Sequence, residues 1–288
     1  MKKAGVLRKA IQSGHIVPLP GIFDCWGARV VEDIGFPGAY ISGLCLAGTM
    51  GFPDIGIATM SEVVRQAGYI ADAVNIPVIA DADTGYGSYV NVARTIKAFE
   101  KSGIAGVHIE DQLNPKKCGA LPGIELTSKE EMIGRIKAAV DARVDQDFIV
   151  IARTDAPGVY GIQETIDRCN AFISAGADVS MVIGPMSKED ITQIGSKVRG
   201  TKLAVIYSSG LAPSLSLREL EKMGYHLAIL PIQLLQYQIG ASYKFLKAYK
   251  DSGSLGELMK EMADFNELKR LQKLEEYQNA EAKYQKRK

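Results

Sequence analysis

Eight short runs of apolar and β-branched residues recur along this chain, and they constrain its fold more than any other feature. They occupy residues 16–21, 39–44, 77–83, 106–112, 148–155, 178–184, 202–208 and 227–232. Continuous apolar runs of this length are typical of parallel strands that are buried on both faces. Apolar residues three and four positions apart predict amphipathic helices between them, at residues 61–74, 89–103, 128–144 and 160–176.

The ends of the predicted helices repeat a pattern in which a glycine precedes a small residue and a buried strand, as in KSGIAGVHI and SAGADVSMV. Glycine in this place stops a helix and leads the chain into a parallel strand. Neither GxGxxG nor GxxxxGK[ST] follows the first strand, which disfavours a doubly wound sheet. Eight strand–helix units therefore predict an α/β fold, a (β/α)8 TIM barrel, over residues 1–253.

Residues 254–288 form a highly charged segment that we treat as a separate helical C-terminal arm. An apolar stripe with helical spacing runs along it, formed by Leu255, Leu258, Met262, Phe265, Leu268 and Leu271. The stripe indicates an arm that packs on a neighbouring subunit. The simpler explanation is a solvated, frayed C-terminus.

Charge and cysteine content limit the partners of the chain. The formal net charge is +1 over 288 residues and both signs are interspersed, so we expect no nucleic acid or membrane surface as partner. No apolar run approaches the roughly 20 residues that span a bilayer. The four cysteines form no CxxC pair, and the N-terminus lacks the apolar core of a signal peptide. These features predict a reduced, cytoplasmic protein that binds a small molecule.

Polar and charged residues concentrate where the predicted strands one to five end, from Asp24 after the first to Arg153 and Asp155 at the fifth, which is where barrel enzymes carry their active sites. Asp81 and Asp83 stand two apart and project from one face of the third strand. Two close anions need compensation, and hard oxygen ligands suit Mg²⁺ or Mn²⁺. The simpler explanation is that one aspartate caps the next helix and the other is solvated.

Two long connections, residues 45–60 and 112–127, also stand out, because loops of this length in compact domains are often functional. The second carries two lysines, a cysteine and two glycines. This composition suits a mobile cover over an anionic ligand.

Several motifs occur together in one order: PGIFDCWGARVVEDIGF, YISG, GFPDIG, IADADTGYG, HIEDQ, PKKCG and ARTDA. Over roughly residues 5–250 the chain resembles the isocitrate lyase and phosphoenolpyruvate mutase superfamily, in particular the branch containing methylisocitrate lyase and 2,3-dimethylmalate lyase. The resemblance implies a barrel whose last helix is swapped with a neighbour, in a homotetramer built as a dimer of dimers. It also implies a Mg²⁺ site formed by Asp54, Asp81, Asp83 and Glu110.

The resemblance further implies a carbon–carbon lyase that cleaves a 2-hydroxy acid to a 2-keto acid such as pyruvate and a carboxylic acid. The substrate carboxylate is expected at the backbone N–H groups of Ser42, Gly43 and Leu44, with Arg153 supplying positive charge. Arg153 has an alternative role as the ion-pair partner of Asp155. Cys118 is expected as general acid, assisted by Lys116 and Lys117; the simpler explanation is that Cys118 is only a small loop residue.

The chain departs from the family where polar or aromatic residues usually stand. These positions are Leu44, Ala120, Ile183, Val205, Ser208 and the remnant of a GxTP element at 210–213. We expect Ile183 and Ser208 to line the substrate-binding site, opposite the charged half. Apolar walls reject a charged group and favour alkyl groups, so the sequence predicts an alkyl-substituted malate as substrate rather than methylisocitrate.

Three other functions remain open at this point. A phosphonomutase is disfavoured because that branch carries an asparagine-containing loop in place of PKKCG. An oxaloacetate hydrolase or decarboxylase needs the same charged half and makes few demands of the apolar half. A non-catalytic protein that binds a keto acid is disfavoured because all the candidate metal ligands, Arg153 and Cys118 are present together.

Overall fold

A computed structural model describes residues 2–208 and 215–285 of the chain. Its contacts divide the chain into two compact units, Met1–Leu234 and Leu235–Lys288. The remnant at residues 210–213 lies outside the described residues. No helix in the part of the chain that the structure describes is long and apolar enough to cross a lipid bilayer.

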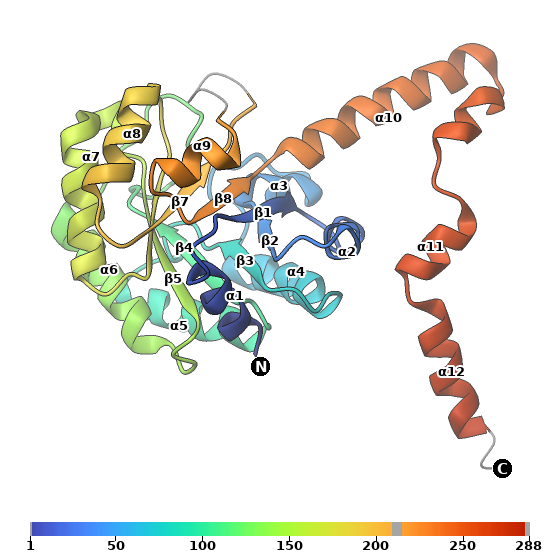
Figure 1. Ribbon diagram of the computed structural model, residues 1–288, viewed down its shortest axis with the longest axis horizontal. Helices are drawn as coiled ribbons and strands as arrows, with labels where there is room; N and C mark the ends of the chain where they lie inside the picture. The colour runs from blue at the N-terminus through green and yellow to red at the C-terminus, as the bar shows by residue number, and fades with distance from the viewer. Residues whose placement is uncertain (1, 209–214, 286–288) are drawn as a thin grey trace. The chain divides into compact units, whose positions relative to one another are not determined.

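The first unit is a closed barrel of eight parallel strands, as the sequence predicted (Figure 1). The strands follow one another around the barrel in chain order, and β1 pairs with β8 to close it. Each strand overlaps one predicted apolar run. They are β1 (Val17–Ile22), β2 (Ala39–Ile41), β3 (Val78–Asp81), β4 (Gly106–Glu110), β5 (Ile149–Thr154), β6 (Val179–Val182), β7 (Thr201–Val205) and β8 (Leu227–Leu230).

Helices surround this barrel (Figure 1). In chain order they are α1 (Lys3–Ile11), α2 (Cys25–Ile34), α3 (Gly43–Thr49), α4 (Met60–Asp72), α5 (Tyr89–Lys101), α6 (Lys129–Ala142), α7 (Pro157–Ser174), α8 (Lys188–Lys197) and α9 (Leu217–Lys222). The four predicted helices correspond to α4, α5, α6 and α7. The expected connection at 45–60 is shorter than predicted, because α3 occupies its first residues and buries Cys45, Leu46 and Ala47.

Strand alternation divides the buried side chains into an inner and an outer set. Along β5, Ile149 and Ile151 belong to the cluster inside the barrel, whereas Val150 and Ala152 belong to the cluster under the surrounding helices. Ala4 and Leu7 of α1 join the inner cluster. Residues of a strand that are two apart therefore share one face, so Arg153 continues the inward set of β5.

The second unit consists of helical segments. Most of α10 (Gln233–Ser252) belongs to it, followed by a 3₁₀ helix η1 (Gly256–Glu261), α11 (Phe265–Leu271) and α12 (Leu274–Gln285). The segments η1, α11 and α12 lie within the expected arm at residues 254–288 and are separated by non-helical residues. The side chains of Leu255, Met262 and Phe265, three members of the predicted stripe, are exposed.

We predict that Gly21→Ala destabilises the seam that closes the barrel. A Cβ atom at Gly21 in β1 would lie 2.4 Å from the carbonyl oxygens of Leu230 and Pro231, which are backbone atoms of the adjoining strand and its continuation. Overpacking of this kind costs about 1–3 kcal/mol. Gly48→Ala in α3 is the matched control, since nothing lies within 4 Å of its added Cβ. Urea denaturation should show a lower free energy of unfolding for Gly21→Ala but not for Gly48→Ala. Equal stability of the two variants would contradict the steric argument.

Candidate active site

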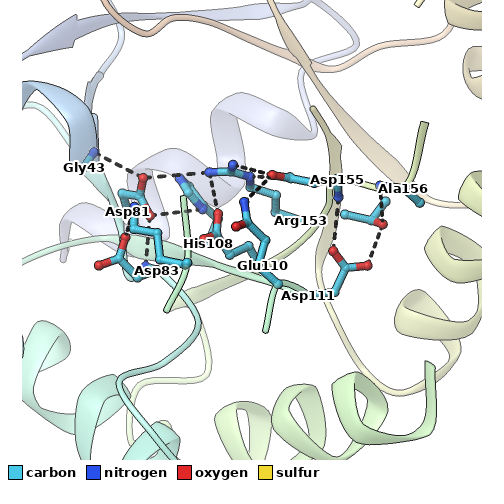
Figure 2. Close-up of polar contacts among 12 residues, drawn as sticks. Gly43, Asp81, Asp83, His108, Glu110, Asp111, Arg153, Asp155 and Ala156 are labelled. Carbon is cyan, nitrogen blue, oxygen red and sulfur yellow. Dashed lines mark hydrogen bonds and ion pairs between the residues drawn. The ribbon is translucent and has the colours of Figure 1, made fainter. Parts of the chain in front are cut away.

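The carboxyl ends of β2 to β5 bring the predicted charged residues together (Figure 2). Asp81 ends β3, Glu110 ends β4, and Arg153 is the penultimate residue of β5. The register places Asp81 opposite His108 and Glu110 opposite Arg153. All four of these side chains are buried. A charged cluster therefore lies within the mouth of the barrel rather than on its rim.

Arg153 is the centre of this cluster (Figure 2). Its Nε and Nη2 each donate a 2.8 Å hydrogen bond to one oxygen of Asp155. Its Nη1 lies 2.8 Å from Glu110 Oε2 and 3.9 Å from Asp81 Oδ2. Burial opposes the charge of Arg153, but these carboxylates outweigh it and raise the pKa of the guanidinium further. The pairing with Asp155 is the alternative that the sequence left open for Arg153.

Asp81 is held by backbone donors as well as by charges. The Asp83 N–H donates to Oδ1 at 2.9 Å, and the Gly43 N–H donates to Oδ2 at 3.1 Å. Burial favours the neutral acid, yet His108, Lys116 and Arg153 together lower the pKa of Asp81 to about 2. An added Cβ at Gly43 would lie 2.7 Å from Asp81 Oδ2. Only glycine therefore allows the start of α3 to approach this carboxylate so closely.

Asp54 and Asp83, the other two predicted metal ligands, both contact the same lysine. Lys116 Nζ forms ion pairs with Oδ1 of Asp54 and with Oδ1 of Asp83, the second at 2.5 Å. The lysine is buried, which opposes its charge, but Asp83, Glu110, Asp81 and Asp54 raise its pKa above the ordinary value. Lys116 thus supplies the cation that Asp54 and Asp83 contact in this structure.

The turn after β3 presents Asp83 in an unusual backbone conformation. Asp83 has φ 47° and Tyr86 has φ 61°, both in the left-handed region. Aspartate tolerates this region better than a bulky residue such as tyrosine does. Strained residues of this kind concentrate at functional sites, where the surrounding structure holds them in place.

The excess of acid fits a divalent cation. Five carboxylates share the two cations Lys116 and Arg153; they are Asp54, Asp81, Asp83, Glu110 and Asp155. Burial raises the pKa of Asp83 to about 6 and raises that of Glu110 well above its usual range. Glu110 Oε1 is buried without a hydrogen-bond donor among the described residues. These hard oxygen donors are of the kind that Mg²⁺ prefers.

The side chains are not arranged as a closed metal cage. Across residues 2–208 and 215–285, no group of three or more histidine, cysteine, aspartate or glutamate side chains is close enough to hold a metal ion. A cavity of about 380 Å³ opens beside the Asp83–Lys116 pair. Its polar lining includes Thr84, Asn91, Arg94 and Asn114. A small charged ligand therefore has space next to the carboxylates.

The loop between β4 and α6 lies over the charged cluster. The Gln112 side chain donates to Asp155 Oδ2 at 2.7 Å and to the Lys117 carbonyl at 2.9 Å, and it accepts from the Lys117 N–H. An added Cβ at Gly119 would lie 2.5 Å from Ile183 and 2.9 Å from Arg153 Nη2. The loop therefore packs directly against both halves of the site.

Cys118 lies in this loop, next to the acidic residues. Its N–H donates to the Asp54 carbonyl at 2.9 Å. Burial raises the pKa of the Cys118 thiol, and Lys116 and Arg153 lower it only in part. Lys117 points elsewhere, because its Nζ donates to the Gly123 carbonyl. The thiol is therefore protonated at neutral pH, as a proton donor must be.

The opposite side of the mouth is apolar, as the sequence predicted. Ile183 and Val205 pack against the cluster inside the barrel. Leu44 is half-buried near the start of α3, whereas Ala120 and Ser208 are exposed. Of the substrate-binding residues expected from the sequence, Ser42, Gly43 and Leu44 thus lie beside Asp81, and Ile183 lies across the mouth under the loop.

Sequence reasoning did not single out Gln112 or Tyr207 as site residues. Gln112 ends the HIEDQ motif, so its position after β4 was a usable signal. Tyr207 lies two residues beyond β7, where the alternation that turns Leu203 and Val205 inward places it on the same face. No motif marks it.

Comparisons with known proteins find relatives that match the chain along nearly its whole length. The family profile described as phosphoenolpyruvate phosphomutase matches residues 7–249. A 2,3-dimethylmalate lyase from Eubacterium barkeri is 39% identical over 285 residues, which cover 99% of each chain. A crystal structure of 2,3-dimethylmalate lyase has a TM-score of 0.92 at 36% identity and covers 99% of this chain and 96% of that chain. A phosphonopyruvate hydrolase in complex with oxalate and Mg²⁺ has a TM-score of 0.89 at 28% identity and covers 99% of both chains.

We predict an acid-dependent loss of stability that originates at His108. Its Nε2 lies 2.9 Å from the Tyr40 hydroxyl, and its Nδ1 lies 3.6 Å from Asp81 Oδ1. Burial lowers the pKa of His108 to about 4, with Arg153 and Lys116 assisting and Asp81 opposing. The unfolded chain takes up this proton near pH 6.5 and the folded chain does not, so folding loses stability as pH falls from about 6.5 to 4.

The measurement is the free energy of unfolding of the wild type and of His108→Gln at several pH values. Relative to the variant, the wild type should lose about 3 kcal/mol over this range. The same comparison removes the contributions of groups that do not interact with His108. A difference that stays constant with pH would contradict the assignment.

Proposed function

The chain belongs to the phosphoenolpyruvate phosphomutase family, and on that premise we propose that it is a Mg²⁺-dependent carbon–carbon lyase that cleaves an alkyl-substituted malate. The products would be pyruvate and a short carboxylic acid. One observation carries this proposal: the mouth of the barrel has a charged half at β2 to β5 and an apolar half at Ile183 and Val205. Similarity to a 2,3-dimethylmalate lyase along the whole chain supports the same class of reaction.

In this proposal, Asp54, Asp81, Asp83 and Glu110 would hold the Mg²⁺ ion, which would take the place of Lys116 beside Asp54 and Asp83. When bound, the ion supplies Lewis-acid stabilisation of negative charge on an oxygen of the 2-hydroxy acid. The backbone N–H groups at Ser42, Gly43 and Leu44 would receive the substrate carboxylate, for which the Gly43 N–H would exchange its hydrogen bond to Asp81 Oδ2. Arg153 adds positive charge and keeps the carboxylates around it in place.

Cys118 completes the reaction as general acid. As the C2–C3 bond breaks, the 2-hydroxyl would lose its proton to a carboxylate of the site and become the keto oxygen. The electron pair would stay on the carbon that departs with its carboxylate, and this carbon must take a proton. The raised pKa of Cys118 keeps a proton on the thiol, and the packing of Gly119 against Arg153 and Ile183 holds the loop at the mouth. Until the ion binds, Lys116 balances the negative charge of Asp54 and Asp83 beside it.

We also propose that the protein is a cytoplasmic homotetramer in which the arm at residues 254–288 is swapped onto a neighbouring subunit. The exposed apolar side chains of Leu255, Met262 and Phe265 support a partner surface for this arm. The four free cysteines support a reducing compartment.

The proposed function predicts pyruvate release that depends on a divalent cation. Pyruvate would be followed through lactate dehydrogenase with Mg²⁺, using 2,3-dimethylmalate, 2-methylisocitrate, citramalate and oxaloacetate. We expect turnover of an alkylmalate and loss of that turnover with EDTA. The apolar Ile183 and Val205 should make 2-methylisocitrate the poorer substrate.

Other outcomes of this panel point to different functions. Good turnover of 2-methylisocitrate with none of 2,3-dimethylmalate would contradict the proposed substrate class. Release from oxaloacetate alone would favour a hydrolase or decarboxylase. No turnover at all, in a protein that Mg²⁺ and oxalate still stabilise against heat, would favour a non-catalytic keto-acid-binding protein.

We predict that Cys118→Ser lowers the rate of cleavage at least about a hundredfold. A hydroxyl is a far weaker acid than a thiol, and general acid catalysis contributes 10²–10⁴-fold to a rate. Thermal shifts with Mg²⁺ and oxalate should be unchanged, since the thiol is not among the proposed ligands. Cys169→Ser is the matched control, because Cys169 is buried between the barrel and its helices. Unchanged turnover of Cys118→Ser would overturn the general-acid assignment.

A further inference from the structure

Tyr207 carries a polar group into the apolar half of the site. It lies two residues beyond β7 (Thr201–Val205), and it continues the inward set formed by Leu203 and Val205. Its hydroxyl is buried, the Gly184 backbone N–H faces its oxygen, and no acceptor for the hydroxyl proton lies within hydrogen-bond distance in the described part of the chain. Buried polar groups without partners are uncommon and destabilise a folded protein. A hydroxyl in this position therefore needs a functional explanation.

The surroundings of Tyr207 place it at the reaction site. Arg153 and Asp155 at the end of β5, the Gly184 backbone after β6, and Cys118 in the loop all influence its ionisation. Burial is the largest influence and raises the pKa of the phenol, so the hydroxyl keeps its proton at neutral pH. Tyr207 is thus a neutral hydrogen-bond donor near Arg153, Asp155 and Cys118.

The neighbouring side chains leave few other donors for a ligand on this side. Ile183 and Val205 have only apolar side-chain atoms, and Arg153 is engaged by Asp155 and Glu110. A substrate fragment that carries an alkyl group and one carboxylate matches this combination. The alkyl group would contact Ile183 and Val205, and one neutral donor would face the carboxylate.

We propose that the Tyr207 hydroxyl binds the departing half of the substrate by donating a hydrogen bond to its carboxylate. The inference rests on the proposed lyase function, because it assigns a partner to the fragment that Cys118 protonates. It makes Tyr207 a specificity-determining residue. Binding sites that donate a hydrogen bond discriminate strongly against ligands that lack the acceptor.

The test compares malate with lactate, which lacks the second carboxylate and is otherwise similar. Affinities would be measured by calorimetry with Mg²⁺ present, on the wild type and on Tyr207→Phe, which removes only the hydroxyl. We expect the wild type to bind malate more tightly than lactate. In Tyr207→Phe the affinity for malate should fall about 10- to 100-fold, and the affinities for lactate and oxalate should stay the same.

Tyr225→Phe is the matched control. The Tyr225 hydroxyl is also buried, but it donates a 3.1 Å hydrogen bond to the Ile191 carbonyl, outside the site. Its removal should lower the melting temperature and leave malate binding unchanged. Tyr207→Phe should keep or raise the melting temperature, because it removes a hydroxyl whose proton has no acceptor.

Three results would overturn the proposal for Tyr207. They are a wild type that binds malate no better than lactate, a Tyr207→Phe protein with unchanged malate affinity, and a Tyr207→Phe protein that loses both ligands equally together with stability. Failure of the lyase function is a separate result. In that case malate would still bind more weakly to Tyr207→Phe than to the wild type, but the wild type would release no pyruvate from any alkylmalate.

Discussion

The shortage of positive charge at the mouth of the barrel is the constraint on which the site depends. Lys116 and Arg153 together contact five carboxylates, and most of these groups are buried. Taking charges out of water costs several kcal/mol for each ion, and only close pairing offsets that cost. The positions of Asp81, Glu110 and Asp155 therefore follow from the position of Arg153. The remaining acidity is what makes the site suitable for a divalent cation.

The two halves of the mouth differ because the strands that build them end differently. Strand β3 ends in Asp81, β4 ends in Glu110, and β5 ends in Arg153 followed by Thr154. In contrast, β6 ends in Val182 and β7 ends in Val205. A ligand between the halves meets ionic groups on one side and hydrocarbon on the other. Such a site favours a molecule that is itself asymmetric, with a chelating end and an alkyl end. Tyr207 places one neutral donor within the apolar half.

Local patterns in the sequence were sufficient for the strands and for the residues at their ends. Apolar runs mark β1 to β8, and alternation within β5 directs Arg153 inward. Local patterns could not predict that Lys116 reaches Asp54, because these residues are 62 positions apart and belong to two different loops. Likewise, α3 was missed because its helix follows from the burial of Cys45, Leu46 and Ala47, not from a strong periodic pattern.

The position of Cys118 follows from the residues on either side of it. Lys116 is held by ionic contacts with Asp54 and Asp83. The Lys117 backbone is held by hydrogen bonds with the Gln112 side chain. Gly119 packs closely against Ile183 and Arg153. Gln112 in turn donates to Asp155, the partner of Arg153. The loop is thus connected through one hydrogen-bond chain to the cluster that it covers. Because its anchors are the charged groups of the site, the position of the thiol at the mouth of the barrel depends on those groups.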